Sequence, residues 1–105
     1  MSYQTLISVD ALHALPPAER VLFDCRFDLA KPAWGENAYR EAHLPGARYA
    51  HLDRDLAAPI TATSGRHPLP SREDFARRVG AWGVGPQTQV VVYDQGNGMY
   101  AARLW

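Results

Sequence analysis

One short stretch late in the sequence constrains the fold more than any other. Residues 89–93 hold three consecutive valines and no charged side chain, which is typical of a strand in a sheet that is covered on both faces. A tight loop over residues 94–98 follows, and a helix is predicted to begin at Met99. Residues 21–23 form a second apolar run that ends in Asp24 and predicts another buried strand. Strands that alternate with helices indicate an α/β fold with a parallel sheet.

Two helices are predicted from the residues that can cap them. Ser8 can cap a helix that runs to about residue 15, and Val9 is among the side chains expected to face inward. Ser71 and Asp74 form a pattern close to a capping box, with Asp in place of the usual Glu. The helix that they begin should end near Gly83.

Two other segments carry no regular pattern. Residues 26–37 contain Pro32 and Gly35 and are predicted to be irregular. Residues 51–70 form a long connection rich in Pro, Thr, Ser and Gly. Loops of this length without regular structure are usually functional or disordered, so this connection is a candidate location for functional residues.

Size and charge exclude several classes of partner. The 105 residues suffice for one small domain with one core. Formal net charge is zero, which argues against a nucleic-acid partner. No apolar run approaches the ~20 residues needed to span a bilayer, and the first five residues lack the basic region of a signal peptide. We therefore expect a cytoplasmic protein that binds neither nucleic acid nor membranes.

Cysteine and histidine usage gives no sign of a metal or other cofactor. The single cysteine, Cys25, excludes an internal disulfide and a cysteine-only metal site. The four histidines show no short metal-ligand spacing, so we expect no metal and no cofactor. Of these histidines, His13 and His51 are interpreted as surface residues.

Residues 39–47 read Tyr-Arg-Glu-Ala-His-Leu-Pro-Gly-Ala and form the most informative motif. A short helical run should end at His43, and Pro45 and Gly46 should then turn the chain, because Pro fixes φ and Gly accepts positive φ. The spacing resembles the signature of the rhodanese-like sulfurtransferases. One position departs from it, since Ala50 stands where that family usually has a bulky residue.

The resemblance extends over nearly all of residues 1–105. Residues 22–26 are similar to the family's first strand and its Asp-x-Arg, whose Asp24 and Arg26 should pair near the end of the sheet. Residues 71–84 resemble the helix before the central strand, and 90–105 resemble that strand and the next helix in the N-terminal domain of two-domain thiosulfate and 3-mercaptopyruvate sulfurtransferases.

We therefore expect residues 1–105 to be an incomplete N-terminal rhodanese-like domain. The chain stops about two turns into a predicted helix and offers only three or four candidate strands, whereas a parallel sheet usually continues through a further crossover. The interpretation is a parallel sheet flanked by helices and truncated after the central strand. The catalytic C-terminal domain would then be absent, and it would be an intramolecular partner of this one.

The chemistry implied by the resemblance is transfer of a sulfane sulfur. A cysteine persulfide carries sulfur from thiosulfate or 3-mercaptopyruvate to cyanide or a thiol. Where a catalytic domain has that cysteine, this chain has Asp94, and a carboxylate is no sulfur nucleophile. The degenerate loop consists of Asp94, Gln95, Gly96, Asn97 and Gly98. Cys25 lacks the Cys-x5-Arg spacing of an oxyanion loop and is interpreted as a buried structural residue, so the isolated chain should be inactive.

The resemblance also implies three supporting site residues. Asp53 and His67 match an Asp and a His that assist catalysis in 3-mercaptopyruvate sulfurtransferases, and Tyr100 matches a tyrosine that contacts substrate. A carboxylate can orient an imidazole, and an imidazole can transfer a proton near neutral pH. The alternative is that Asp53 caps local backbone, that His67 has no partner and that Tyr100 only packs on the core.

Two interpretations of function remain open from the sequence. In the first, the chain is half of a two-domain sulfurtransferase and acts only when joined to its C-terminal half. In the second, it is a non-catalytic rhodanese-like module that binds or regulates a partner.

Overall fold

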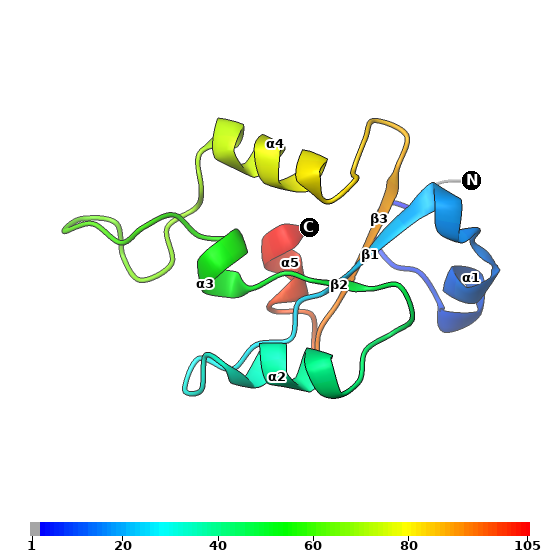
Figure 1. Ribbon diagram of the computed structural model, residues 1–105, viewed down its shortest axis with the longest axis horizontal. Helices are drawn as coiled ribbons and strands as arrows, with labels where there is room; N and C mark the ends of the chain where they lie inside the picture. Colours follow the sequence, from blue (N-terminus) through cyan, green and yellow to red (C-terminus); the bar gives the residue numbers. More distant parts are fainter. Residues whose placement is uncertain (1–2) are drawn as a thin grey trace.

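The computed structural model describes residues 3–105 and contains a three-stranded parallel sheet (Figure 1). Strand β1 (Arg20–Asp24) pairs with β2 (Arg48–Tyr49) on one side and with β3 (Gln89–Tyr93) on the other. The predicted α/β fold is therefore confirmed. However, the middle strand is β1, and β3, which the resemblance placed at the centre, lies at an edge of this sheet. Met1 and Ser2, where the segment considered for a signal peptide begins, lie outside the described residues.

Helices cover both faces of the sheet, as the apolar strands predicted (Figure 1). On one face, Phe23 packs with Trp82 and Leu104. On the other face, Leu22 packs with Leu12 and Tyr39. The helical segments are α1 (Val9–Ala14), the single-turn η1 (Pro17–Glu19), α2 (Trp34–Glu41), α3 (Leu52–Asp55), α4 (Arg72–Ala81) and α5 (Ala101–Leu104). Side chains that alternate along β1 therefore contact helices on opposite sides of one sheet.

The two predicted capped helices form, but one inward-facing residue is wrong. The Ser8 hydroxyl accepts the amide of Ala11 at 3.1 Å at the start of α1. Val9 nevertheless remains 83% exposed, because α1 reaches the core through Leu12 in its next turn. In α4, the Ser71 hydroxyl accepts the amide of residue 74 at 3.1 Å, as the capping pattern predicted.

Helix α2 begins and ends earlier than the sequence suggested. It starts at Trp34, inside the segment that was predicted to be irregular, and ends at Glu41 rather than at His43. Ala42 is already extended, with φ −163° and ψ 139°. Its carbonyl is taken by the Arg26 guanidinium at 2.6 Å, which holds this end of the helix against the sheet.

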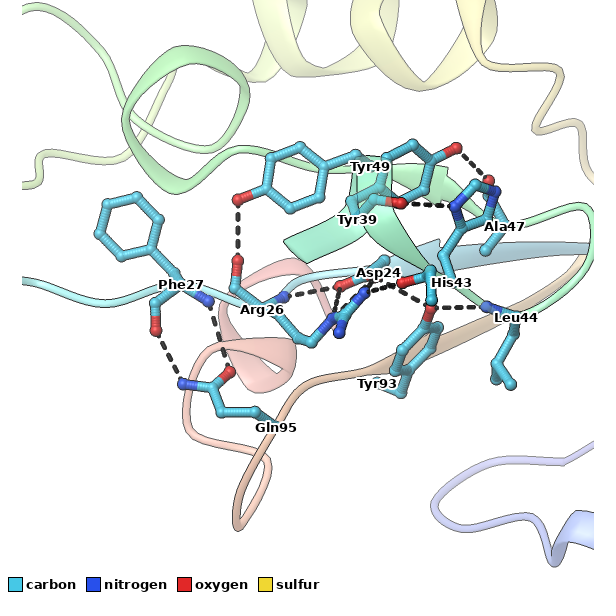
Figure 2. A network of polar contacts seen from close by, with 11 residues as sticks. Asp24, Arg26, Phe27, Tyr39, His43, Leu44, Ala47, Tyr49, Tyr93 and Gln95 are labelled. Atoms are coloured by element: carbon cyan, nitrogen blue, oxygen red, sulfur yellow. Dashed lines mark hydrogen bonds and ion pairs between the residues drawn. The ribbon is translucent and has the colours of Figure 1, made fainter. Parts of the chain in front are cut away.

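The nine-residue motif is held together by contacts within itself (Figure 2). The Tyr39 hydroxyl donates to the carbonyl of Ala47 at 2.5 Å. The His43 ring stacks on Tyr39 with centroids 3.8 Å apart, and its Nδ1 donates to the Tyr39 carbonyl at 2.7 Å. Gly46 has φ +80°, so the predicted turn is confirmed. His43 thus bonds backbone within the motif.

A buried carboxylate anchors this motif to the sheet. Asp24 is fully buried and accepts three guanidinium contacts from Arg26 at 2.7 to 3.1 Å, which confirms the predicted pair. The Tyr93 hydroxyl donates to Asp24 at 3.0 Å and accepts the amide of Leu44 at 3.2 Å (Figure 2). Burial, aided by the bond to Asp24, raises the pKa of Tyr93 to about 12. The hydrogen bond to Asp24 likewise raises the pKa of Arg26.

We predict that Asp24→Asn lowers the free energy of unfolding by about 2–3 kcal/mol. Removing one partner of a fully buried pair costs roughly 3–5 kcal/mol, and the loss is smaller here because the Arg26 side chain keeps 21% exposure. Urea unfolding measures the change. The matched control is Glu41→Gln, which alters an exposed carboxylate and should change stability by less than ~0.5 kcal/mol. Equal losses in both variants would contradict the prediction.

Candidate active site

The long connection begins with a capped helical turn that carries Asp53. His51 Nδ1 accepts the amides of Asp53 at 3.1 Å and Arg54 at 3.2 Å, while the His51 amide donates to the Asp55 carboxylate at 2.9 Å. The half-buried His51 ring also packs edge-on against Phe27, with centroids 5.4 Å apart. The interpretation of His51 as a surface residue is therefore wrong. This capping role is hard to predict from sequence, because the usual capping residues are Ser, Thr, Asp and Asn.

Asp53 and His67 come together across the long connection, which extends away from the sheet (Figure 1). Asp53 Oδ1 lies 3.0 Å from His67 Nδ1, and the two side chains are 45% and 30% exposed. Within residues 3–105, the buried Nδ1 atom has no well-aligned hydrogen-bond partner, so this contact is close but imperfectly directed. The two residues that the resemblance singled out are thus brought into contact, and their catalytic role stays a prediction.

An open pocket of about 490 Å³ lies beside this pair. Its apolar walls include Phe27, Leu29 and Ile60. Arg66 is the one Lys or Arg side chain among its lining residues, and it has no ion-pair partner within the part of the chain that the structure describes. The pocket therefore combines apolar surface, one cation and the Asp53–His67 pair, which suits a small anionic ligand.

The degenerate loop holds its own carboxylate in a cradle of backbone amides. Asp94 Oδ1 accepts the amides of Gly96 at 2.9 Å and Gly98 at 3.1 Å. Oδ2 accepts those of Tyr100 at 2.9 Å and Ala101 at 3.0 Å, at the start of α5. Burial alone would raise the pKa of Asp94, but these four hydrogen bonds outweigh it and lower the pKa. The cradle is thus filled from within by an ion that cannot act as a sulfur nucleophile.

Gln95 connects this loop to Phe27, in the segment that follows β1. Its side-chain amide donates to the Phe27 carbonyl at 2.7 Å and accepts the Phe27 amide at 3.3 Å (Figure 2). The Tyr100 ring packs edge-on against Phe27, with centroids 5.8 Å apart. Phe27 and Tyr100 line a second open pocket of about 470 Å³ that does not include His67. Tyr100 also packs against the core, and its contact with substrate stays a prediction.

Comparison with known proteins places this geometry in a family. The model of the rhodanese-like domain matches residues 8–105. The chain belongs to the rhodanese-like domain family. The resemblance noted in its nine-residue motif is therefore confirmed.

The relatives of this rhodanese-like domain are longer proteins. It is 44% identical over 107 residues to the probable 3-mercaptopyruvate sulfurtransferase of Pseudomonas aeruginosa, in a match that covers 100% of this chain and 38% of that protein. It is 40% identical over 81 residues to human 3-mercaptopyruvate sulfurtransferase, over 70% of this chain and 26% of that protein. The structure of 3-mercaptopyruvate sulfurtransferase from Leishmania major is similar with a TM-score of 0.78 and 32% identity, over 84% of this chain and 25% of that one. The chain thus spans well under half the length of these relatives.

The cysteine of the rhodanese-like domain is poorly placed for nucleophilic chemistry. Cys25 is 2% exposed, and its amide donates to the Tyr93 carbonyl at 2.8 Å. Burial, and then the negative charges of Asp24 and Asp94, raise the pKa of its thiol to about 12. The thiolate is the reactive form, so this thiol is inert at neutral pH. The interpretation of Cys25 as a buried structural residue is confirmed.

Within residues 3–105, no three His, Cys, Asp or Glu side chains gather where they could hold a metal ion. Over the same residues, no helix has the length and apolar character needed to cross a membrane.

We predict that Asp94→Asn destabilises the domain by about 1–3 kcal/mol near neutral pH. An asparagine offers one acceptor oxygen, and its NH₂ group would face two backbone donors that Asp94 now satisfies. Because the folded-state pKa of Asp94 lies below its ordinary value of 3.8, its stabilisation is present above that pH and is lost as pH falls below it.

Denaturant unfolding of both proteins, from neutral pH to below pH 3.8, measures the loss of stability. The difference between wild type and Asp94→Asn should narrow as pH falls below 3.8. Asp10→Asn, which changes an exposed carboxylate on α1, serves as the control and should change stability by less than ~0.5 kcal/mol. A difference that stays constant with pH would show that the amide cradle does not depend on the charge of Asp94.

Proposed function

We propose that this chain is the N-terminal half of a two-domain sulfurtransferase. The enzyme moves sulfane sulfur from thiosulfate or 3-mercaptopyruvate to cyanide or a thiol. The observation that carries the proposal is the 3.0 Å contact of Asp53 with His67 beside an open pocket, in a rhodanese-like domain whose own loop carries Asp94. The nucleophilic cysteine belongs to a C-terminal rhodanese-like domain, which is the intramolecular partner.

The two donors make different demands on proton transfer. With thiosulfate, the cysteine thiolate attacks the outer sulfur, the S–S bond breaks, and sulfite leaves with the bonding electron pair. With 3-mercaptopyruvate, the thiolate attacks the donor sulfur, the C–S bond breaks, and the carbon leaves as the enolate of pyruvate. That enolate takes up a proton to become pyruvate. In both cases, cyanide or a thiolate then removes the outer sulfur of the persulfide and regenerates the cysteine thiolate.

His67 is suited to supply the proton that the enolate needs. An imidazole donates and accepts protons near neutral pH. The Asp53 carboxylate lies 3.0 Å from Nδ1, so that Nε2 is the nitrogen left for the donor. Both donors are anions, and Arg66 on the pocket wall would attract their charge. Because only the enolate formed from 3-mercaptopyruvate needs a proton, the Asp53–His67 pair matters most for that donor.

The alternative function is a non-catalytic module that binds or regulates a partner. Two observations favour it for the isolated chain, namely the filled amide cradle at Asp94 and the buried thiol of Cys25. Neither offers a reactive sulfur nucleophile. A sulfur-transfer assay of the whole protein separates the two functions, because a module without catalysis would leave the whole protein inactive as well.

We predict that residues 1–105 alone form no thiocyanate from thiosulfate and cyanide, whereas the whole protein does. The reason is the absence of an ionised, accessible cysteine among the described residues. The Cys25→Ser variant of the isolated chain is the control for trace activity. Turnover by the isolated chain that disappears in Cys25→Ser would contradict this prediction and identify Cys25 as the nucleophile.

We predict that His67→Ala in the whole protein lowers kcat for 3-mercaptopyruvate by about 10²-fold, the low end for general acid–base catalysis. Turnover of thiosulfate should change little, because sulfite leaves without a proton. Asp53→Asn should give a smaller loss in the same direction, since Asp53 only orients the ring.

Steady-state kinetics with both donors measures these effects, and thermal melts check folding. The matched control is His13→Ala, an exposed histidine on α1 that should leave both reactions unchanged. Substitutions at such exposed positions usually change stability by less than ~0.5 kcal/mol. Unchanged kinetics in His67→Ala would leave His67 with a structural role only.

A further inference from the structure

One guanidinium contacts both chain segments that carry the Asp53–His67 pair. Arg103 Nε donates to the carbonyl of Leu56 at 3.1 Å, and its Nη2 donates to the carbonyl of His67 at 2.7 Å. Leu56 directly follows α3, the helical turn on which Asp53 lies. Arg103 lies on α5, 47 residues after Leu56 and 36 residues after His67 in the sequence. The two bonds therefore fix the separation between the start and the end of the long connection.

The geometry of these contacts is specific to arginine. Arg103 is half-buried and forms no ion pair within residues 3–105. Its donors are directed at backbone carbonyls instead. A guanidinium presents its N–H groups in a rigid plane, whereas a lysine ammonium is a single point on a flexible stem. A lysine at this position could reach one carbonyl but could not hold both at a fixed spacing.

Little else holds the His67 end of the connection in place. One backbone bond, from the Ala58 amide to the Pro68 carbonyl at 2.8 Å, closes the connection near its base. Between those residues, the bonds within residues 61–65 are local to a turn. The contact between Asp53 and His67 is itself imperfectly aligned. The position of the imidazole therefore depends strongly on the hold that Arg103 has on the His67 backbone.

The helix that carries Arg103 is in turn held by the degenerate loop. Asp94 Oδ2 accepts the amides of Tyr100 and Ala101 at the start of α5, and Ala101 is buried in the core. A continuous series of contacts thus runs from Asp94 through α5 and Arg103 to His67. The loop, which holds Asp94 and no nucleophilic cysteine, thus contributes to the placement of the histidine.

We propose that Arg103 is a positioning residue for the Asp53–His67 pair. It holds the two backbone segments at the spacing that keeps the imidazole against the carboxylate at the pocket wall. The kinetic consequence rests on the proposed function, whereas the structural consequence does not.

The kinetic test uses Arg103→Lys in the whole protein. We expect kcat for 3-mercaptopyruvate to fall about tenfold, less than the roughly 10²-fold that a 1 Å misplacement can cost. KM and thiosulfate turnover should change little. In a His67→Ala background, Arg103→Lys should cause no further loss, because Arg103 acts through His67. Arg72→Lys is the matched control, since Arg72 is exposed on α4 and should affect neither donor.

The structural test is independent of activity. Nitrogen–proton correlation spectra of the histidine rings report the environment of His67, and Asp53→Asn provides the reference for a lost contact. Arg103→Lys should move the His67 signals toward that reference and leave those of His13 unchanged. If Arg103→Lys does not fold, Arg103→Gln, which keeps a planar donor of smaller reach, replaces it in both tests.

Either of two results would overturn the proposal. One is a His67 spectrum that is unchanged in the Arg103 variant. The other is an equal loss of kcat in the presence and absence of the His67 side chain. If the whole protein turns over neither donor, the proposed function fails. If it does not turn over 3-mercaptopyruvate, the kinetic test cannot be made and the spectra alone decide the role of Arg103.

Discussion

The buried carboxylate of Asp24 must be neutralised and hydrogen-bonded, and the residues that do so also hold neighbouring segments in place. A charge removed from water needs an opposite charge and hydrogen bonds around it. Arg26 supplies the charge from the same strand end, and Tyr93 supplies a hydroxyl from the neighbouring strand. Each partner also holds the Tyr39–Ala47 motif, through the carbonyl of Ala42 and the amide of Leu44. These contacts hold the segments that follow β1 and β3 in place. Both pockets are lined by residues from such segments, at the carboxyl ends of parallel strands where ligands usually bind.

A second carboxylate explains how a rhodanese-like loop can persist without its nucleophile. Four converging backbone amides need a negative charge, and Asp94 provides it from within the chain. The loop keeps its shape and caps α5, but it offers no vacant anion site. Under the proposed function, this domain contributes the Asp53–His67 pair and the pocket beside it. Arg103 of α5 bonds the carbonyls of Leu56 and His67, so contacts connect the degenerate loop to the backbone of this pair.

Local patterns were predictable from the sequence, and long-range contacts were not. Strands β1 and β3 and the Pro-Gly turn follow from neighbouring residues, and the Asp24–Arg26 pair followed from the resemblance. Helix α2 was placed too late because Ala33, which precedes it, has no side chain that can cap a helix. The Asp53–His67 contact came from the resemblance alone, since spacing in an irregular connection does not determine which residues meet. Arg103 was missed because its partners are carbonyls 36 and 47 residues away, which no side-chain pattern encodes.

The charges around Phe27 bear on where an anionic donor would bind. Phe27 lines both pockets, but the pocket shared with Tyr100 also carries the carboxylates of Asp28 and Asp94 and no basic side chain. The pocket beside His67 carries Arg66, whose charge offsets that of the Asp53 carboxylate in the same wall. An anion is repelled by the two carboxylates of the first pocket, whereas in the second pocket Arg66 balances the single carboxylate, and low-dielectric walls such as the Phe27 ring strengthen these effects. The predicted contact of Tyr100 with substrate therefore faces an unfavourable field, and the His67 side of Phe27 is the less repulsive of the two pockets for an anion.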